Sequence, residues 1–359
     1  MSKIRIFSII TIALAFLGFL SGPAFSACEV VGDGDQMVEL AVAANFAIPI
    51  KNVIENYFFT DTSHDYASEY KFNLCSGATG NFLSEIISDT AGHSRYDILF
   101  AANTAAPAQL VTGGFNAGPA ATYVIGRLAL FSNSSGPVIG PDDNTATTTL
   151  IKDQFGGQIV IADPVNAPYG GAAKQVLSDP TINANNQYVT STGALTNLLY
   201  QVSDIGLVYT TVFNGSTTYP LGFVAASDIC SAYTPTNNHI WMVNQSYYTP
   251  LQQAAVSLLS DHDPAATTGA QALLDYILSN AAVRTGLVNL YCYSLPPAKT
   301  TKTGKLNASP YLSSSPSLAS YSLPFGVTNA VFHESLQILN GDYAVAEHPF
   351  SGRSSAVWR

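Results

Sequence analysis

The hydrophobic positions along the chain repeat one pattern: a short apolar run, a turn of small polar residues, and a segment with apolar residues at helical spacing. The apolar runs are residues 38–43, 70–74, 158–162 and 187–189. The helical segments that follow them cover residues 46–57, 81–87, about 172–176, and 194–200. Strands that alternate with helices favour a parallel sheet with right-handed crossovers. The pattern therefore predicts an α/β fold.

The turns of this pattern bring Asn, Thr, Gly or Ser to each helix start. They contain Asn45, residues 77–80, residues 168–171 and residues 190–193. Such residues cap helices and let backbone amides face a ligand. Helix starts attract anions, because the free N–H groups and the helix dipole point the same way. One such turn is an ordinary cap, but four of them at strand ends predict a shared anion site.

The same pattern divides the chain into two lobes. Residues 38–123 form one α/β block, residues 124–235 form a second, and residues 236–295 return to the first with Trp241 and a helical segment over residues 251–284. We expect each lobe to be a mostly parallel sheet flanked by helices. Two helix starts from each lobe would then enclose a small anion in the cleft between the lobes.

The N-terminus has the features of a secretory signal peptide. Lys3 and Arg5 precede the uncharged residues 6–20, and small residues follow. A membrane anchor needs about 20 apolar residues, and this run is shorter. Residues 1–27 are therefore predicted to be removed, which makes the protein periplasmic or otherwise exported. Cleavage before Cys28 would leave a lipid anchor on that residue, and this alternative stays open.

Charge and composition exclude several classes of protein. Of 359 residues, 47% are hydrophobic and 11% are charged, which is a globular composition. The formal net charge of −10 argues against a nucleic-acid partner.

Residues 296–324 are rich in Ser and Pro and indicate a linker. Residues 325–359 form a C-terminal extension of unknown role.

An exported chain favours disulfides, and the four cysteines allow three connectivities. Cys28 precedes one predicted strand and Cys75 ends the next, which favours Cys28–Cys75 with Cys230–Cys292. The other two connectivities stay open. No CxxC spacing indicates a metal site. The segment 261–263 (DHD) is interpreted as a solvated turn and not as a set of ligands.

Six segments, taken together and in order, resemble the periplasmic molybdate-binding proteins of ABC importers over about residues 38–295. They are residues 41–46 (AVAANF), 77–82 (GATGNF), 96–103 (YDILFAAN), 161–164 (IADP), 167–170 (APYG) and 206–209 (GLVY). The resemblance implies a two-lobed periplasmic-binding-protein fold with two strand crossovers. It also implies an oxyanion held by neutral donors, a membrane permease as partner, and a monomer.

The resemblance also implies the residues of the site. Asn45 and Thr79 would bind from the first lobe. Tyr169 and Ser191 would bind from the second lobe through backbone amides, and Tyr209 through its hydroxyl. Many relatives have Ser at the position of Asn45, and Asn103 stands where the third motif usually has Asp. These departures leave the choice of oxyanion open.

The predicted function is capture of molybdate or tungstate as a bound ligand, without a cofactor, for delivery to an ABC importer. One alternative is another tetrahedral oxyanion such as sulfate. A second is a surface-interaction protein that has lost transport, suggested by the Tyr- and Ser-rich tail. An enzyme is not expected, because the chain has no GxSxG segment and nothing pairs His239, His333 or His348 with a nucleophile.

Overall fold

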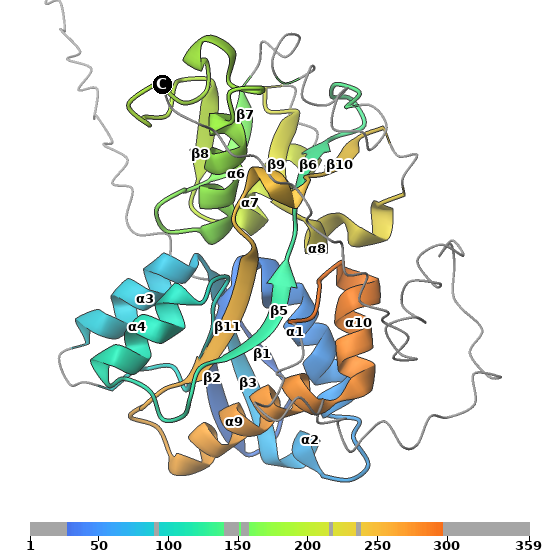
Figure 1. The fold of residues 1–359 in the computed structure, drawn as a ribbon. Coiled ribbons are helices and arrows are strands. Elements are labelled where there is room, and N and C mark those ends of the chain that lie inside the picture. Colours follow the sequence, from blue (N-terminus) through green and yellow to red (C-terminus); the bar gives the residue numbers. More distant parts are fainter. Residues whose placement is uncertain are drawn as a thin grey trace, which may run out of the picture. The chain divides into compact units, whose positions relative to one another are not determined.

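Two separate β-sheets organise the protein (Figure 1). A computed structural model describes residues 27–89, 93–139, 151, 158–214, 218–234 and 238–296. Most of the predicted signal peptide, and the predicted linker and extension after residue 296, lie outside these residues. The strands are β1 Ala27–Val31, β2 Gln36–Ala43, β3 Tyr70–Gly77, β4 Ile98–Phe100, β5 Ala121–Gly126, β6 Leu128–Ser132, β7 Ile159–Ala162, β8 Leu199–Val202, β9 Leu221–Ala225, β10 Ile240–Met242 and β11 Leu251–Ser257.

The first sheet has the strand order β1-β3-β2-β4-β11-β5, and the second has the order β10-β6-β9-β7-β8. We call each sheet, with the helices packed on it, the first and the second lobe. Strands β3, β2 and β4 run parallel to one another, and so do β9, β7 and β8. The remaining pairings are antiparallel. The α/β fold is confirmed, but both sheets are mixed because strands that cross between the lobes run back through them.

Helices cover the sheets where the strand residues are apolar on alternating faces. The helices are α1 Ala47–Val53, α2 Tyr66–Glu69, α3 Thr79–Ser88, α4 Ala105–Gly113, α6 Pro168–Ser178, α7 Ile205–Phe213, α8 Ala226–Ile229, α9 Pro264–Ser279 and α10 Ala281–Tyr291, with a π-helix η2 Ile54–Phe58 and the 3-10 turns η1 Ala44–Phe46, η4 Ala184–Asn186, η5 Cys230–Ala232 and η6 Gln245–Tyr247. Leu40 and Val42 of β2 share a core with α1, α9 and α10. Ala41 points to the other face, where it packs with α3 and α4. Burial on both faces explains why β2 is an almost continuous apolar run.

The second lobe packs around one apolar cluster. All four residues of β7 are buried, and α6 and α7 contribute Val176 and Val208 to the same cluster. Trp241 of β10 is fully buried there. The sequence places residues 236–295 in the first lobe, but β10 pairs with β6 of the second sheet. The chain therefore returns to the first lobe after residue 242.

The expected helix over residues 251–284 is wrong at its beginning. Residues Leu251–Ser257 form β11, which pairs with β4 and β5. The helix begins at Pro264, where Asp263 caps it. A short apolar run has no periodicity that separates a buried strand from a buried helix, and this run is buried on both faces.

The expected helix over residues 194–200 is also wrong. Gly193 has a φ of +81°, and the amide of Ala194 donates to the Thr190 hydroxyl at 3.0 Å. These contacts close a tight turn. Val189, before the turn, pairs with Leu195, after it, in a single antiparallel bridge. The chain then forms β8 at Leu199–Val202, so Ser191 lies in an exposed turn and not at a helix start.

The preferred disulfide pairing is confirmed. Cys28 lies directly opposite Cys75 where β1 pairs with β3, and the two are bonded. Cys230 in η5 is bonded to Cys292 at the end of α10. The first bridge fastens the edge strand β1 to its neighbour, and the second joins segments 62 residues apart.

We predict that the denatured chain takes up no alkylating reagent until it is reduced, because both bridges use all four cysteines. The paired substitution Cys28→Ser/Cys75→Ser should lower the free energy of unfolding in urea by about 2 to 4 kcal/mol. One reactive thiol in the unreduced wild type would show that Cys28 is modified and Cys75 is free.

Candidate functional site

A small cavity lies where the starts of four helices from the two lobes meet. Its walls are the starts of η1 and α3 from the first lobe and of α6 and α7 from the second, together with Gly77 and Ala102. The cavity volume is about 10 Å³, roughly the room that one water molecule needs. The parallel strands β2, β3 and β7 lead into the first three helix starts, so the carboxyl ends of strands from both sheets converge on one point.

Three of these helix starts have no side-chain cap. The N-cap residues of η1, α3 and α6 are Ala43, Ala78 and Ala167, whose methyl groups cannot accept a hydrogen bond. The first N–H groups of a helix have no partner within it. With the helix dipoles, these groups favour negative charge in the cavity. At α7, the Asp204 carboxylate already accepts from the Leu207 amide at 3.1 Å.

The two lobes touch at the cavity through close backbone contacts. The amide of Gly80 in α3 donates to the carbonyl of Asn166 at 2.8 Å. A Cβ atom on Gly80 would lie 2.8 Å from the Cα atom of Asn166, so only glycine permits this approach. Ser227 of α8 donates its hydroxyl to the carbonyl of Asn45 at 3.0 Å.

Asn45 and Thr79 line the cavity as the sequence predicts, and each is 1% exposed. The Thr79 hydroxyl accepts from the Ala102 amide at 3.0 Å, which leaves its hydrogen to donate. The Asn45 amide nitrogen makes the polar contacts of that side chain, whereas its Oδ1 atom is buried without a hydrogen-bond partner. Both residues therefore retain unused polar capacity at the cavity.

Tyr169 also lines the cavity, as the second residue of α6. Burial raises the pKa of its hydroxyl well above the usual value, so this group remains a hydrogen-bond donor. Ser191 and Tyr209 are not among the residues that line the cavity. Tyr209 lies within α7, with its ring against Phe131 and Phe213. The structure therefore brings three of the five predicted residues to the cavity wall.

Among the described residues, no lysine or arginine lines the cavity, and Asp204 is the one charged residue in its wall. A second carboxylate lies nearby on α8. Burial raises the pKa of Asp228 to about 8, and the Asp204 charge adds to the shift. The Oδ2 atom of Asp228 is buried without a hydrogen-bond partner. Near neutral pH, Asp228 is therefore mostly uncharged and adds little negative potential to the region.

Asp204 at the start of α7 and the inner partners of Asn45 are not among the residues predicted from the sequence. Asp204 followed by the apolar residues of α7 is a readable N-cap signal. Gln253 and Tyr293 lie within 3.0 Å of the Asn45 amide nitrogen, but they are 208 and 248 residues away along the chain. No local pattern connects such residues.

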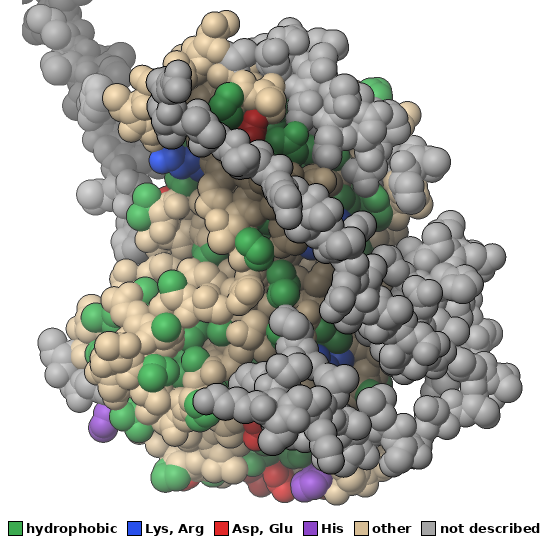
Figure 2. Space-filling view, in the orientation of Figure 1, with side chains coloured by type: hydrophobic (Ala, Val, Ile, Leu, Met, Phe, Trp, Pro, Cys, Tyr) green, Lys and Arg blue, Asp and Glu red, His purple; other side chains and the backbone are tan. Residues whose placement is uncertain are grey.

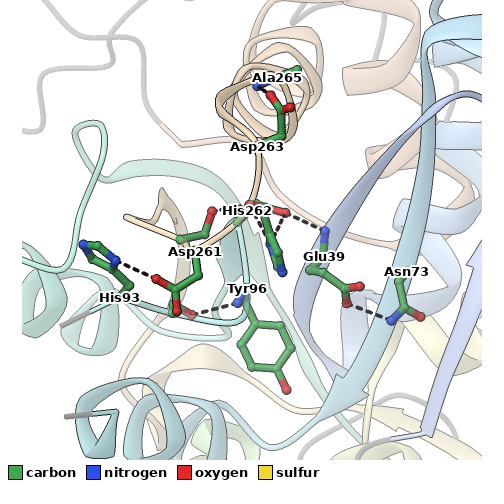
Figure 3. A network of polar contacts seen from close by, with 11 residues as sticks. Glu39, Asn73, His93, Tyr96, Asp261, His262, Asp263 and Ala265 are labelled. Carbon is green, nitrogen blue, oxygen red and sulfur yellow. Dashed lines mark hydrogen bonds and ion pairs between the residues drawn. The ribbon is translucent and has the colours of Figure 1, made fainter. Parts of the chain in front are cut away.

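The three residues of the segment 261–263 have partners within the protein. Asp261 contacts His93 at 2.7 Å, and Asp263 caps α9 through the amide of Ala265 (Figure 3). His262 was expected in a solvated turn, but its Nδ1 atom contacts the fully buried Asp97 at 3.1 Å. Across the described ranges, no group of three metal-ligating side chains occurs.

On the face that Figure 2 shows, the visible basic side chains are isolated and do not gather into a patch. This distribution agrees with the acidic net charge of −10. Within the part of the chain that the structure describes, no helix combines the length and the apolar character that crossing a bilayer requires.

The family model of the bacterial extracellular solute-binding proteins matches residues 38–285. The chain belongs to this family. The molybdate-binding protein ModA of Azotobacter vinelandii is 34% identical over 259 residues, which cover 72% of this chain and 90% of the relative. ModA of Rhodobacter capsulatus is 30% identical over 283 residues, covering 78% and 94%. As a solute-binding protein of an extracytoplasmic family, the chain is not an enzyme.

Solved structures of solute-binding proteins share the fold. The periplasmic molybdate-binding protein of Azotobacter vinelandii matches with a TM-score of 0.55 and 24% identity, over 72% of this chain and 100% of that one. The substrate-binding protein of an ABC transporter from Agrobacterium tumefaciens matches with a TM-score of 0.55 and 13% identity, over 78% and 86%. The periplasmic-binding-protein fold inferred from the sequence is confirmed.

The raised pKa of Asp228 predicts a pH-dependent stability. The folded protein retains this proton up to about pH 8, whereas the unfolded chain releases it near the ordinary value of 3.8. The free energy of unfolding should therefore fall as pH rises through this window. Asp228→Asn cannot ionise, so it should be more stable than the wild type at pH 8 by about 1 kcal/mol or more. Urea unfolding at pH 5 and pH 8 measures this difference, and equal differences at both values would contradict the assignment.

Proposed function

We propose that this solute-binding protein captures a tetrahedral oxyanion, molybdate or tungstate, and delivers it to the permease of an ABC importer. The observation that carries the proposal is a cavity walled by three uncapped helix starts and by Asn45 and Thr79, with no lysine or arginine among its described wall residues. The names of the two ModA relatives support molybdate as the ligand.

The chemistry of the walls suits capture followed by release. Hydrogen bonds to a charged acceptor contribute about 1.5 to 3 kcal/mol each, so several neutral donors hold a dianion firmly. A buried cation would form a desolvated charge pair that is costly to break. Neutral donors divided between two lobes release the anion when the lobes separate, since neither wall alone supplies the full set.

The donors that we assign are the Asn45 amide, the Thr79 hydroxyl and the backbone amides at the start of α6, including that of Tyr169. The present cavity has room for about one water molecule, so an oxyanion requires the lobes to separate slightly. Ser191 and Tyr209 remain predicted ligands. Both belong to the second lobe, and Tyr209 lies on the same helix as the wall residue Ile205.

We predict that molybdate and tungstate bind at micromolar concentration, while sulfate and phosphate have no effect at millimolar concentration. Donors fixed on two lobes leave some bonds unmade around the smaller sulfate, at a cost of about 1 to 3 kcal/mol for each. Phosphate carries a proton near neutral pH, to which a set of donors offers no acceptor. Calorimetric titration of the four anions tests this order. Equal affinity for sulfate would contradict the assignment of molybdate or tungstate as the ligand. No binding of any oxyanion would favour the surface-interaction alternative.

The role of Tyr209 is tested by Tyr209→Phe, which keeps the ring and removes the hydroxyl. Loss of one hydrogen bond to a charged acceptor should weaken molybdate affinity roughly 10- to 150-fold. Tyr200→Phe, at a partly exposed position of the same lobe, is the matched control and should retain full affinity. Unchanged affinity in Tyr209→Phe would remove this residue from the site.

A further inference from the structure

The side chain of Tyr169 reaches the region where the two lobes are joined. It is 1% exposed although it comes from the first turn of α6. Its hydroxyl oxygen lies 3.0 Å from the amide nitrogen of Gln253 and 3.4 Å from that of Asn45. Gln253 belongs to β11 and Asn45 to η1, so a second-lobe side chain contacts two first-lobe elements.

Gly126 makes the space for this hydroxyl. It is the last residue of β5, the strand that leads from the first sheet toward β6 of the second. A Cβ atom at this position would lie 2.1 Å from the Tyr169 hydroxyl and 2.4 Å from the Gln253 amide nitrogen. The pairing of β5 with β11 shifts register directly after Gln253. The hydroxyl therefore lies against both strands that connect the lobes.

The polar contacts continue from Gln253 to Asn45, the residue that we propose as a ligand of the oxyanion. The Asn45 amide nitrogen lies 3.0 Å from Gln253 Oε1 and 3.0 Å from the Tyr293 hydroxyl, which itself donates to the Asn45 carbonyl at 2.8 Å. The Tyr123 hydroxyl lies 3.1 Å from Gln253 Oε1 and 3.2 Å from the Ala101 carbonyl. Asn45 thus turns its donor edge inward and keeps its buried Oδ1 without a partner.

An oxyanion changes this arrangement, because it offers acceptors only and needs the donor edge of Asn45. A half-turn of the Asn45 and Gln253 amides presents the NH₂ group of Asn45 to the anion and keeps the contact between Asn45 and Gln253, whereas the Tyr293 hydroxyl no longer accepts from Asn45. Gln253 then donates to Asn45 Oδ1 and to the Tyr123 hydroxyl, while the Tyr169 hydroxyl donates to Gln253 Oε1. In this state Tyr169 is the donor to Gln253 Oε1, so the arrangement depends on its hydroxyl.

We propose that Tyr169 and Gln253 are positioning residues that couple the joined strands to the amide of Asn45 and hold its NH₂ group toward a bound oxyanion. The role of these residues toward the oxyanion rests on the proposed function. Their contact between the lobes does not. This role of the Tyr169 side chain is separate from that of its backbone amide at the cavity.

The first test is Tyr169→Phe, which leaves the backbone donor in place. We expect the molybdate dissociation rate to rise about 3- to 10-fold, the loss of one neutral hydrogen bond, with an unchanged association rate, measured by stopped-flow fluorescence. Tyr188→Phe is the matched control, because this buried hydroxyl of the same lobe donates to the Ile151 carbonyl at 2.7 Å. An equal rise in both variants, or no rise in Tyr169→Phe, would overturn the proposal.

The second test is Gln253→Glu against Gln253→Met. The titration is made above the pKa of the introduced carboxyl group, because burial favours its neutral form. The ionised carboxylate accepts from the Asn45 amide and cannot donate, so it fixes the NH₂ group inward. With the NH₂ group fixed inward, Asn45 would turn its Oδ1 atom toward the anion and repel it. We therefore expect Gln253→Glu to lose at least about 100-fold in molybdate affinity. Gln253→Met removes the positioning contact without reversing it and should lose less. Equal affinities in the two variants would overturn the proposal.

A third measurement does not depend on the ligand. Spin labels at Val111→Cys in the first lobe and Val138→Cys in the second report the separation of the lobes, since both side chains are exposed. Tyr169→Phe should broaden the distance distribution relative to the wild type and to Tyr188→Phe. An unchanged distribution would show that the Tyr169 contact does not hold the two lobes together, and it would overturn that part of the proposal. Absence of oxyanion binding in the wild type would refute the proposed function and leave this measurement valid.

Discussion

The cavity depends on the position of one sheet relative to the other, because neither lobe supplies a complete wall. That position is held where β5 leaves the first sheet and β11 re-enters it, with Gly126 and Gln253 at the crossing. Around this point the polar side chains of Asn45, Tyr123, Tyr169 and Gln253 are buried, and Asn45 Oδ1 is the atom among them that lacks a partner. Directional bonds suit such a position, since apolar packing alone would allow the sheets to slide.

The electrostatics of the protein oppose an anion at long range and favour it at short range. The chain has a formal net charge of −10, and a carboxylate lies in the cavity wall. Salt screens charges beyond about 8 Å at physiological ionic strength. Helix starts act over one turn, so the two effects operate at different distances. An anion in this cavity would therefore be selected by fit to the wall and not by general attraction to the surface.

Local sequence signals predicted the parts of the site that are built locally. Asn45, Thr79 and Tyr169 follow buried strands and begin helices, and all three line the cavity. The helix expected directly after Ser191 does not form, because a left-handed Gly193 turns the chain first. Gln253 belongs to a run whose burial on both faces hides its strand periodicity. Its contact with Asn45 joins residues 208 positions apart, and only the folded chain brings them together.

The bridge between Cys230 and Cys292 changes the connectivity of the two lobes. Cys230 follows β9 and α8 in the second lobe, and Cys292 follows α10 in the first. The intervening chain passes through β10, β11, α9 and α10, so the bridge closes a covalent ring that includes both lobes. A single peptide-bond cut anywhere in that ring leaves every fragment attached. A cut in the connection between β10 and β11 would therefore leave the two lobes covalently joined.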